Sequence, residues 1–390
     1  MRKVAVISVV LGSLTACGGE SGGRDGSPPT SVSTTSTDTV SLTGQVIDGP
    51  VAGARVCLFS DGVQVRDAAG AAVCSTASDA QGNYSLTVSR NIPTGFLTLV
   101  ASTSSYIKLA SALGTVSEVL GAADNSGAIT STKLSSTRIT NFTTANFALA
   151  DTNRDGTVSK AELDAYNANY IKIRPVAALV KAAIDLGQSG SLIAGQTSDT
   201  LQLALAAANN QILGATNKTA AQWAADPGNA AAMAAVDQDL AVGVASGFSS
   251  YQLSTAVTSY QIPARVTANN GAASIGCEVN TNNETATVQI ALDGARGAVI
   301  LKHDNVQTIG TYDPRSGAMS LSENDPLAVS SVSPSGVTYY AEGYFKLNGS
   351  FDASTGKFTG TYSELSANTW SLDATRQVCT AGGTATAIKL

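Results

Sequence analysis

KLNGSFDASTGKFTGTY, residues 346–362, is the stretch that determines how the C-terminal part of the chain folds. Its large side chains Phe351, Phe358 and Tyr362 are spaced by polar or small residues on either side of the turn Asp352–Gly356. Alternation with a period of two is typical of a strand with one buried face, and a Gly-containing turn between two such runs predicts a β-hairpin. We therefore expect antiparallel strands here.

Similar runs lie on both sides of this hairpin. They recur at short intervals with turns such as Asp313–Gly317 between them, at residues 285–290, 297–301, 337–344, 350–352, 357–362 and 370–372. Strand after strand without intervening helical patterns indicates an antiparallel sheet that curls on itself. Residues 260–390 are thus predicted to form an antiparallel β-barrel or sandwich.

Short alternating segments also follow Val40, at residues 41–47, 55–59 and 84–88, and they predict a small β-sandwich over residues 40–102. Three sequences in it, Gly44–Val46, Pro50–Val56 and Asp79–Tyr84, resemble the carboxypeptidase regulatory-like domain. The resemblance implies an immunoglobulin-like or transthyretin-like fold with an accessory role and no peptidase activity.

Between these two β regions, residues 103–259 are predicted to form a helical domain. Ala and Leu recur at helical spacing in residues 175–184 and 201–212, and the pattern resumes at residues 230–244. Four to six helices are expected. The fold class predicted for the whole chain is therefore multidomain α+β.

The clearest chemical motif is DTNRDGTVSKAE, residues 151–162, which falls in the helical region. It resembles the EF-hand loop, whose oxygen ligands come from fixed positions around a sharp turn at Gly156. The expected calcium ligands are Asp151, Asn153, Asp155, Thr157 through its carbonyl group, Ser159 and Glu162. Residues 143–150 and 160–170 would be the flanking helices. An Asp/Gly-rich turn that matches by chance is the alternative.

The N-terminus predicts export and membrane anchoring. Arg2 and Lys3 precede the apolar run Val4–Leu11, as in a signal peptide, here residues 1–16. Leu14–Cys17 resembles the lipobox of bacterial lipoproteins, which implies a lipid on Cys17 and, because Gly18 is not Asp, the outer membrane. Cleavage of an ordinary signal peptide after Ala16 is the alternative. The polar residues 17–39 would be a flexible tether.

Four cysteines remain after Cys17. The predicted disulfides are Cys57 with Cys74 and Cys277 with Cys379, because each pair falls inside one β-rich region and an oxidising envelope preserves such bonds. Free buried thiols are the alternative.

Composition excludes several functions. A net charge of -6 argues against nucleic-acid binding, and one histidine, His303, leaves no histidine-based catalytic triad or zinc site, so no enzyme activity is predicted. The acids Glu323, Asp325, Glu342 and Glu364 offer no selectable catalytic pair. The C-terminal aromatic residues are interpreted as barrel core, or as a ligand face; they are Tyr339, Tyr340, Tyr344, Phe345, Tyr362 and Trp370.

The sequence thus predicts a calcium-binding, non-catalytic lipoprotein of the outer membrane with a structural or adhesive role and an envelope protein or glycan as a partner. The alternative is a lipoprotein whose C-terminal β-domain binds a glycan or a small ligand.

Overall fold

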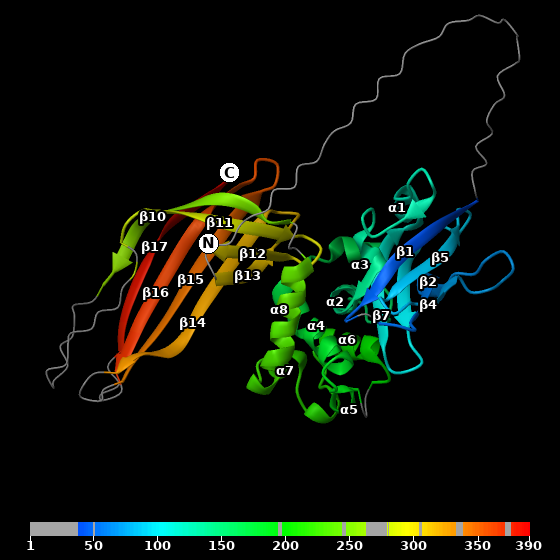
Figure 1. The fold of residues 1–390 in the computed structure, drawn as a ribbon, viewed down its shortest axis with the longest axis horizontal. Coiled ribbons are helices and arrows are strands. Elements are labelled where there is room, and N and C mark those ends of the chain that lie inside the picture. The colour runs from blue at the N-terminus through cyan, green and yellow to red at the C-terminus, as the bar shows by residue number, and fades with distance from the viewer. Residues whose placement is uncertain are drawn as a thin grey trace, which may run out of the picture. The chain divides into compact units, whose positions relative to one another are not determined.

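The computed structural model describes residues 38–49, 51–193, 197–243, 247–262, 279, 281–303, 306–332, 338–370 and 376–390. They form an N-terminal β region, a group of helices and a C-terminal closed barrel (Figure 1), which confirms the mixed α+β class. The predicted signal peptide, Cys17 and the tether as far as residue 37 lie outside the described residues.

The N-terminal β region contains two sheets. In the first, β1 (Thr39–Ile47) pairs antiparallel with β5 (Asn83–Ser89) and parallel with β8 (Ala128–Ile129) and β9 (Arg138–Thr140). The second sheet has the order β3-β2-β6-β7, with β4 also paired to β2. Its strands are β2 (Arg55–Ser60), β3 (Val63–Gln64), β4 (Cys74–Ala77), β6 (Phe96–Ser102) and β7 (Lys108–Thr115). Apolar residues of both sheets share one core.

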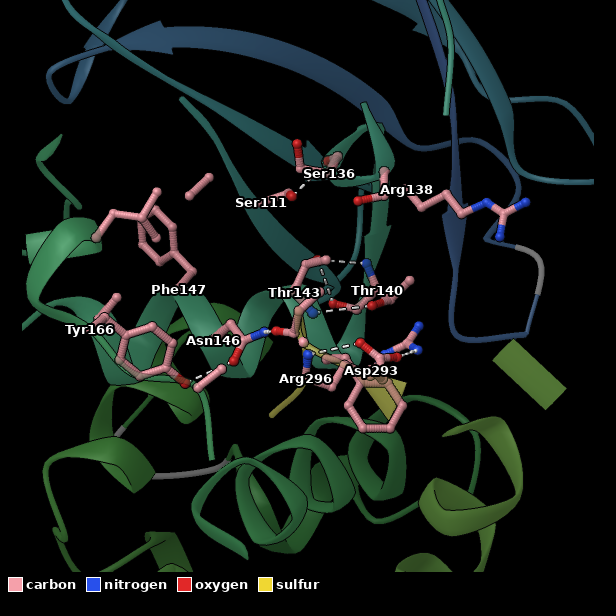
Figure 2. Close-up of a pocket in the computed structure, with 18 of the residues that line it drawn as sticks. Ser111, Ser136, Arg138, Thr140, Thr143, Asn146, Phe147, Tyr166, Asp293 and Arg296 are labelled. Atoms are coloured by element: carbon pink, nitrogen blue, oxygen red, sulfur yellow. Dashed lines mark hydrogen bonds and ion pairs between the residues drawn. The ribbon is translucent and has the colours of Figure 1, made fainter. Parts of the chain in front are cut away.

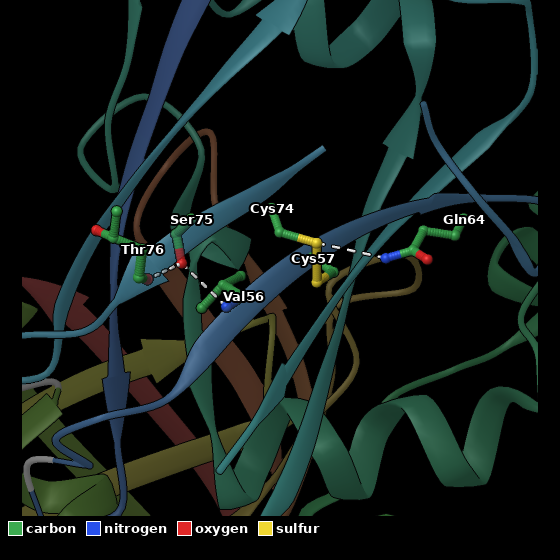
Figure 3. The surroundings of a disulfide bond; sticks show 6 residues. All are labelled: Val56, Cys57, Gln64, Cys74, Ser75 and Thr76. Carbon is green, nitrogen blue, oxygen red and sulfur yellow. Dashed lines mark hydrogen bonds between the residues drawn. A yellow bond between two sulfur atoms is a disulfide. The ribbon is translucent and has the colours of Figure 1, made fainter. Parts of the chain in front are cut away.

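A disulfide joins β2 to β4. Cys57 and Cys74 are directly opposite each other in the ladder, with their Cα atoms 4.0 Å apart, and the predicted bond between them is confirmed (Figure 3). The amide group of Gln64 donates a hydrogen bond of 3.3 Å to the sulfur of Cys74. Cys379 is also disulfide-bonded, while Cys277, its predicted partner, lies outside the described residues.

Residues 103–140, predicted to be helical, differ from that prediction. They contain the strands β7, β8 and β9, and only the short helix α1 (Val116–Gly121) and a 3-10 turn at Ser135–Thr137 are helical. Most of β7 is buried on both faces, and β6 pairs with it along one edge. The hydroxyl of Thr144, in the helix that begins at Asn141, accepts a hydrogen bond from the amide of Ala110 and donates one to its carbonyl. A strand buried on both faces shows no alternation, so its Ala- and Leu-rich sequence could not be told from a helix.

The helical region begins at Asn141. Its helices are α2 (Asn141–Ala150), α3 (Lys160–Ala165), α4 (Tyr170–Ile184), α5 (Ser189–Leu192), α6 (Thr200–Ala208), α7 (Ala220–Ala224) and α8 (Ala230–Gly243), with 3-10 turns at Gly214–Thr216 and Pro227–Asn229. Helix α4 is central, because it packs against α2, α6, α7 and α8. Small alanine side chains on α4 permit this close packing. Within the described part of the chain, no helix has the length and apolar character needed to cross a bilayer.

The C-terminal region is a closed antiparallel barrel, β10 to β17 in sequence order. The strands are β10 (Ser249–Gln261), β11 (Glu284–Asp293), β12 (Ala298–His303), β13 (Val306–Tyr312), β14 (Ala318–Val332), β15 (Thr338–Asp352), β16 (Lys357–Trp370) and β17 (Arg376–Lys389). Of the two predicted alternatives the structure shows the barrel. β10 begins eleven residues before the predicted boundary at residue 260, because residues 249–259 pair with β11 and β17.

One side of the barrel packs on the helices. On β12 the inward-facing Val299 and Leu301 belong to the barrel core, whereas Ala298 and Ile300 belong to the core of the helical region. Between β11 and β12, the carbonyl of Gly297 accepts a hydrogen bond of 3.3 Å from the amide of Tyr170 at the start of α4. The uninterrupted apolar run 298–301 therefore reflects burial on both faces.

Candidate functional site

The loop between α2 and α3 contains the sequence that resembles an EF-hand. Asp151 is the C-cap of α2, and Ser159 is the N-cap of α3. Glu162 completes a capping box, because its Oε2 accepts hydrogen bonds from the amide and hydroxyl of Ser159, at 3.0 and 2.8 Å. Its Oε1 accepts from the amides of Thr152 and Asn153 at 3.0 and 3.1 Å. Glu162 thus joins the end of the loop to its beginning.

Asp151 organises the turn at the centre of the loop. It is 3% exposed, and its two oxygens accept from the amides of Asp155 at 3.1 Å and Gly156 at 2.9 Å. Gly156 has φ = +82°, a value that side chains disfavour. The neighbouring Val158 is buried in the core of the helical region and holds the loop against it.

The remaining predicted ligands lie on the outer side of the same loop. Asp155 accepts from the amide and hydroxyl of Thr157, at 2.8 and 2.7 Å, and from the amide group of Asn153 at 2.9 Å. The hydrogen bonds from Thr157 lower the pKa of Asp155. Burial raises the pKa of Asp151. Burial alone would also raise the pKa of Glu162, but its hydrogen bonds from loop amides outweigh that effect and lower it.

The donor chemistry of this loop fits a calcium ion, because side-chain oxygens of five residues and one backbone carbonyl come from twelve consecutive residues. The carboxylates are not gathered around a common point, however. Among the described residues no group of three or more His, Cys, Asp or Glu side chains is placed to hold a metal ion, and both oxygens of Glu162 accept hydrogen bonds from loop amides instead.

The exiting helix α3 also reaches the barrel. Tyr166, which follows it, donates a hydrogen bond of 2.8 Å to Asn146 of α2, and Arg315 of the β13–β14 turn donates one of 3.3 Å to the carbonyl of Leu163. A crevice of about 580 Å³ lies at this junction (Figure 2). Four charged side chains line it: Arg296 forms an ion pair with Asp293, Arg315 donates to the carbonyl of Leu163, and Arg138 is the fourth.

A second cavity of about 540 Å³ lies within the barrel. Side chains from seven of its strands and Val279 line it: Leu253, Thr255, Val279, Glu284, Ala286, Val288, Leu301, His303, Thr308, Leu321, Glu323, Phe345, Leu347, Tyr362 and Glu364. Of the acids and aromatics singled out from the sequence, Glu323, Glu364, Phe345 and Tyr362 meet here, and Tyr344 is not in the lining.

Other members of that set fall outside the described side chains, namely Asp325, Tyr339, Tyr340, Glu342 and Trp370. Sequence reasoning missed Glu284, which shares the inner face of β11 with Ala286 and Val288. Extending the period-two alternation to the start of that strand would have predicted that Glu284 shares this face. His303 is exposed at the end of β12, as expected of a strand end.

No protein-family model matches this sequence, and no curated protein is significantly similar to it. The loop 151–162 and the barrel cavity are therefore the features that bear on function.

Proposed function

We propose that this chain is a non-catalytic calcium-binding lipoprotein of the bacterial outer membrane in which the ion stabilises the fold. The observation that carries the proposal is the loop 151–162, where Glu162 returns to the first residues of the loop and Asp151 holds the turn at Gly156. This is one continuous segment with the oxygen donors that calcium prefers.

Bound calcium would supply a divalent charge that offsets the mutual repulsion of the loop carboxylates. Asp151, Asn153, Asp155, Ser159 and Glu162 would hold it with side-chain oxygens, and Thr157 with its carbonyl. Glu162 would have to exchange its amide hydrogen bonds for the ion. The loop connects α2 to α3, and α3 contacts both α2 and the barrel, so an ion here would stabilise that junction.

The envelope location rests on the sequence Leu14–Cys17, and it agrees with the Cys57–Cys74 disulfide, since such bonds persist in oxidising compartments. The two N-terminal sheets support the carboxypeptidase regulatory-like sandwich as an accessory or adhesive module. An envelope protein or glycan is the proposed partner.

Calcium is expected to raise the free energy of unfolding of the full chain. An ion that binds only the folded state, at 10 to 100 times its Kd, adds about 1.4 to 2.7 kcal/mol. Glu162→Gln should abolish this gain while keeping the helix cap, because Gln also serves in a capping box. The measurement is urea unfolding with calcium and with EGTA.

Asp164→Asn is the matched control, since Asp164 is an exposed acid on the same helix and its loss should leave the calcium effect intact. Equal stability with calcium and EGTA, together with no heat of calcium binding in calorimetry, would reduce the loop to a hydrogen-bonded turn.

The predicted alternative, in which the C-terminal domain binds a glycan or small ligand, is favoured by one observation, the cavity inside the barrel.

A further inference from the structure

The barrel is filled at one end and hollow further along. Tyr251, Tyr312 and Phe351 pack edge to face, with ring centroids 5.9 and 6.4 Å apart, and together with Phe358 and Met319 they fill the section below the cavity. This cluster forms an apolar floor. Glycines take part in the packing, because a Cβ on Gly349 would lie 2.7 Å from the ring of Phe358.

Along the strands, the cavity wall changes from apolar to acidic. Two residues beyond Tyr362 on β16 comes Glu364, and two beyond Leu321 on β14 comes Glu323. On β11 the same inner face runs from Val288 through Ala286 to Glu284. Residues two apart on a strand share a face, so all three acids follow the apolar part of the wall in the same direction.

Charge in the lining has one sign. The described lining residues include three carboxylates and one imidazole, and no lysine or arginine. Thr308 donates a hydrogen bond of 3.0 Å to Glu323, which orients that carboxylate without neutralising it. A cavity with apolar walls and charges of one sign concentrates ligands of the opposite charge.

The hydroxyl of Tyr362 is a second, independent indication of a ligand site. Tyr362 is 4% exposed and lines the cavity, yet its hydroxyl has no hydrogen-bond partner among the described residues. Burial raises its pKa, and the charges of Glu364 and Glu284 raise it further. Buried hydroxyl groups are nearly always hydrogen-bonded, so an unpaired one beside a cavity points to a polar group supplied from outside.

We propose that the barrel cavity binds an organic cation with an apolar body, such as an alkylammonium group, whose chain lies against Leu301, Leu321 and Leu347 and whose charged end lies among Glu284, Glu323 and Glu364. The Tyr362 hydroxyl meets the polar end of the ligand. The proposal specifies the small-ligand alternative and does not depend on calcium, because the cavity shares no residue with the loop 151–162.

The volume suits such a ligand, since 540 Å³ lies within the range of small-molecule sites. An anionic amphiphile would place its charge among the three carboxylates. A glycan would leave most of its hydroxyl groups against the apolar wall without hydrogen-bond partners, which is costly.

Calorimetry of the full chain with three probes of equal chain length, octylammonium, octanol and octanoate, tests the sign of the charge. Octylammonium is expected to bind about tenfold more tightly than octanol, a difference of about 1.4 kcal/mol, and octanoate more weakly than both. Equal binding of octylammonium and octanoate, or no heat with any probe, would overturn the proposal. A sugar panel that binds when octylammonium does not would point to the glycan instead.

Two variants locate the binding. Glu323→Gln with Glu364→Gln should remove most of the preference for octylammonium over octanol, whereas Asp164→Asn, which removes an exposed charge outside the barrel, should keep it. Tyr362→Phe should weaken octylammonium binding severalfold without lowering the melting temperature, because it deletes only an unpaired buried hydroxyl. Unchanged affinity in all of these variants would place the ligand elsewhere and refute the assignment.

Discussion

Lys181→Met is expected to cost about 3–5 kcal/mol of unfolding free energy at pH 8, because it removes the cation that compensates a buried carboxylate. Lys181 is 8% exposed on α4, and Asp48, which follows β1, is 3% exposed. The Lys181 ammonium group lies 3.1 Å from Oδ1 of Asp48 and 2.9 Å from both Asp185 and Asp239. One cation therefore holds the end of β1 against two helices.

The same cluster makes stability depend on pH. Burial raises the pKa of Asp48 from 3.8 to about 7, although the charge of Lys181 opposes this shift. The second oxygen of Asp48 is buried and accepts no hydrogen bond from the part of the chain that the structure describes, which adds to the cost of ionisation. Between pH 3.8 and about 7 the folded state binds a proton that the unfolded state has lost, so this group's contribution to stability falls as pH rises through that interval.

Urea unfolding at pH 5 and pH 8 measures both the stability lost in Lys181→Met and its dependence on pH. The loss in Lys181→Met should be larger at pH 8, and Asp48→Asn in the Lys181→Met background should recover much of it, because no buried charge remains. Lys160→Met is the matched control, since Lys160 pairs with Asp164 on the surface and such pairs contribute about 0.3–0.5 kcal/mol. A similar loss in both lysine variants would mean that burial of the ion pair does not matter.

Gly297→Ala should cost about 3–5 kcal/mol, because it combines steric overlap with backbone strain at the junction of barrel and helices. Gly297 has φ = +59°, and a Cβ there would lie 2.0 Å from the carbonyl oxygen of Ala168 and 2.8 Å from the amide nitrogen of Asn169. These are backbone atoms just before α4, so they cannot rotate away. The substitution should also weaken the hydrogen bond from Tyr170 to Gly297.

Gly356→Ala separates the cost of backbone strain from the cost of steric overlap. Gly356 also has a positive φ of +64°, but a Cβ there would come no closer than 3.2 Å to another atom, the Cβ of Lys389, so it avoids the backbone overlap found at Gly297. Backbone strain alone should cost about 1–2 kcal/mol. Thermal and urea unfolding of both variants gives the comparison. Equal losses would show that the contact between Gly297 and residues 168–169 does not contribute to stability.

The loop 151–162 shows what spacing can and cannot predict. The fixed positions of Asp151, Gly156 and Glu162 predicted an EF-hand calcium loop with a sharp turn at Gly156. The structure has that turn, and Glu162 accepts a hydrogen bond from the start of the loop, because these contacts are local. Spacing could not place Glu162 relative to the other carboxylates, since its oxygens can accept from loop amides as well as from an ion. Whether calcium binds stays a prediction.

Local patterns in the sequence by themselves determined the antiparallel C-terminal strands, the helix at residues 175–184 and the Cys57–Cys74 pair, because turns, periodicity and short separations act between near neighbours. The tertiary structure alone decided that β7 is a strand and that the C-terminal sheet closes as a barrel. It also decided that Glu284, Glu323 and Glu364 share one cavity, because closure brings β11, β14 and β16 around a common interior. Their proximity depends on strand register around the whole barrel, and no local stretch of sequence contains that information.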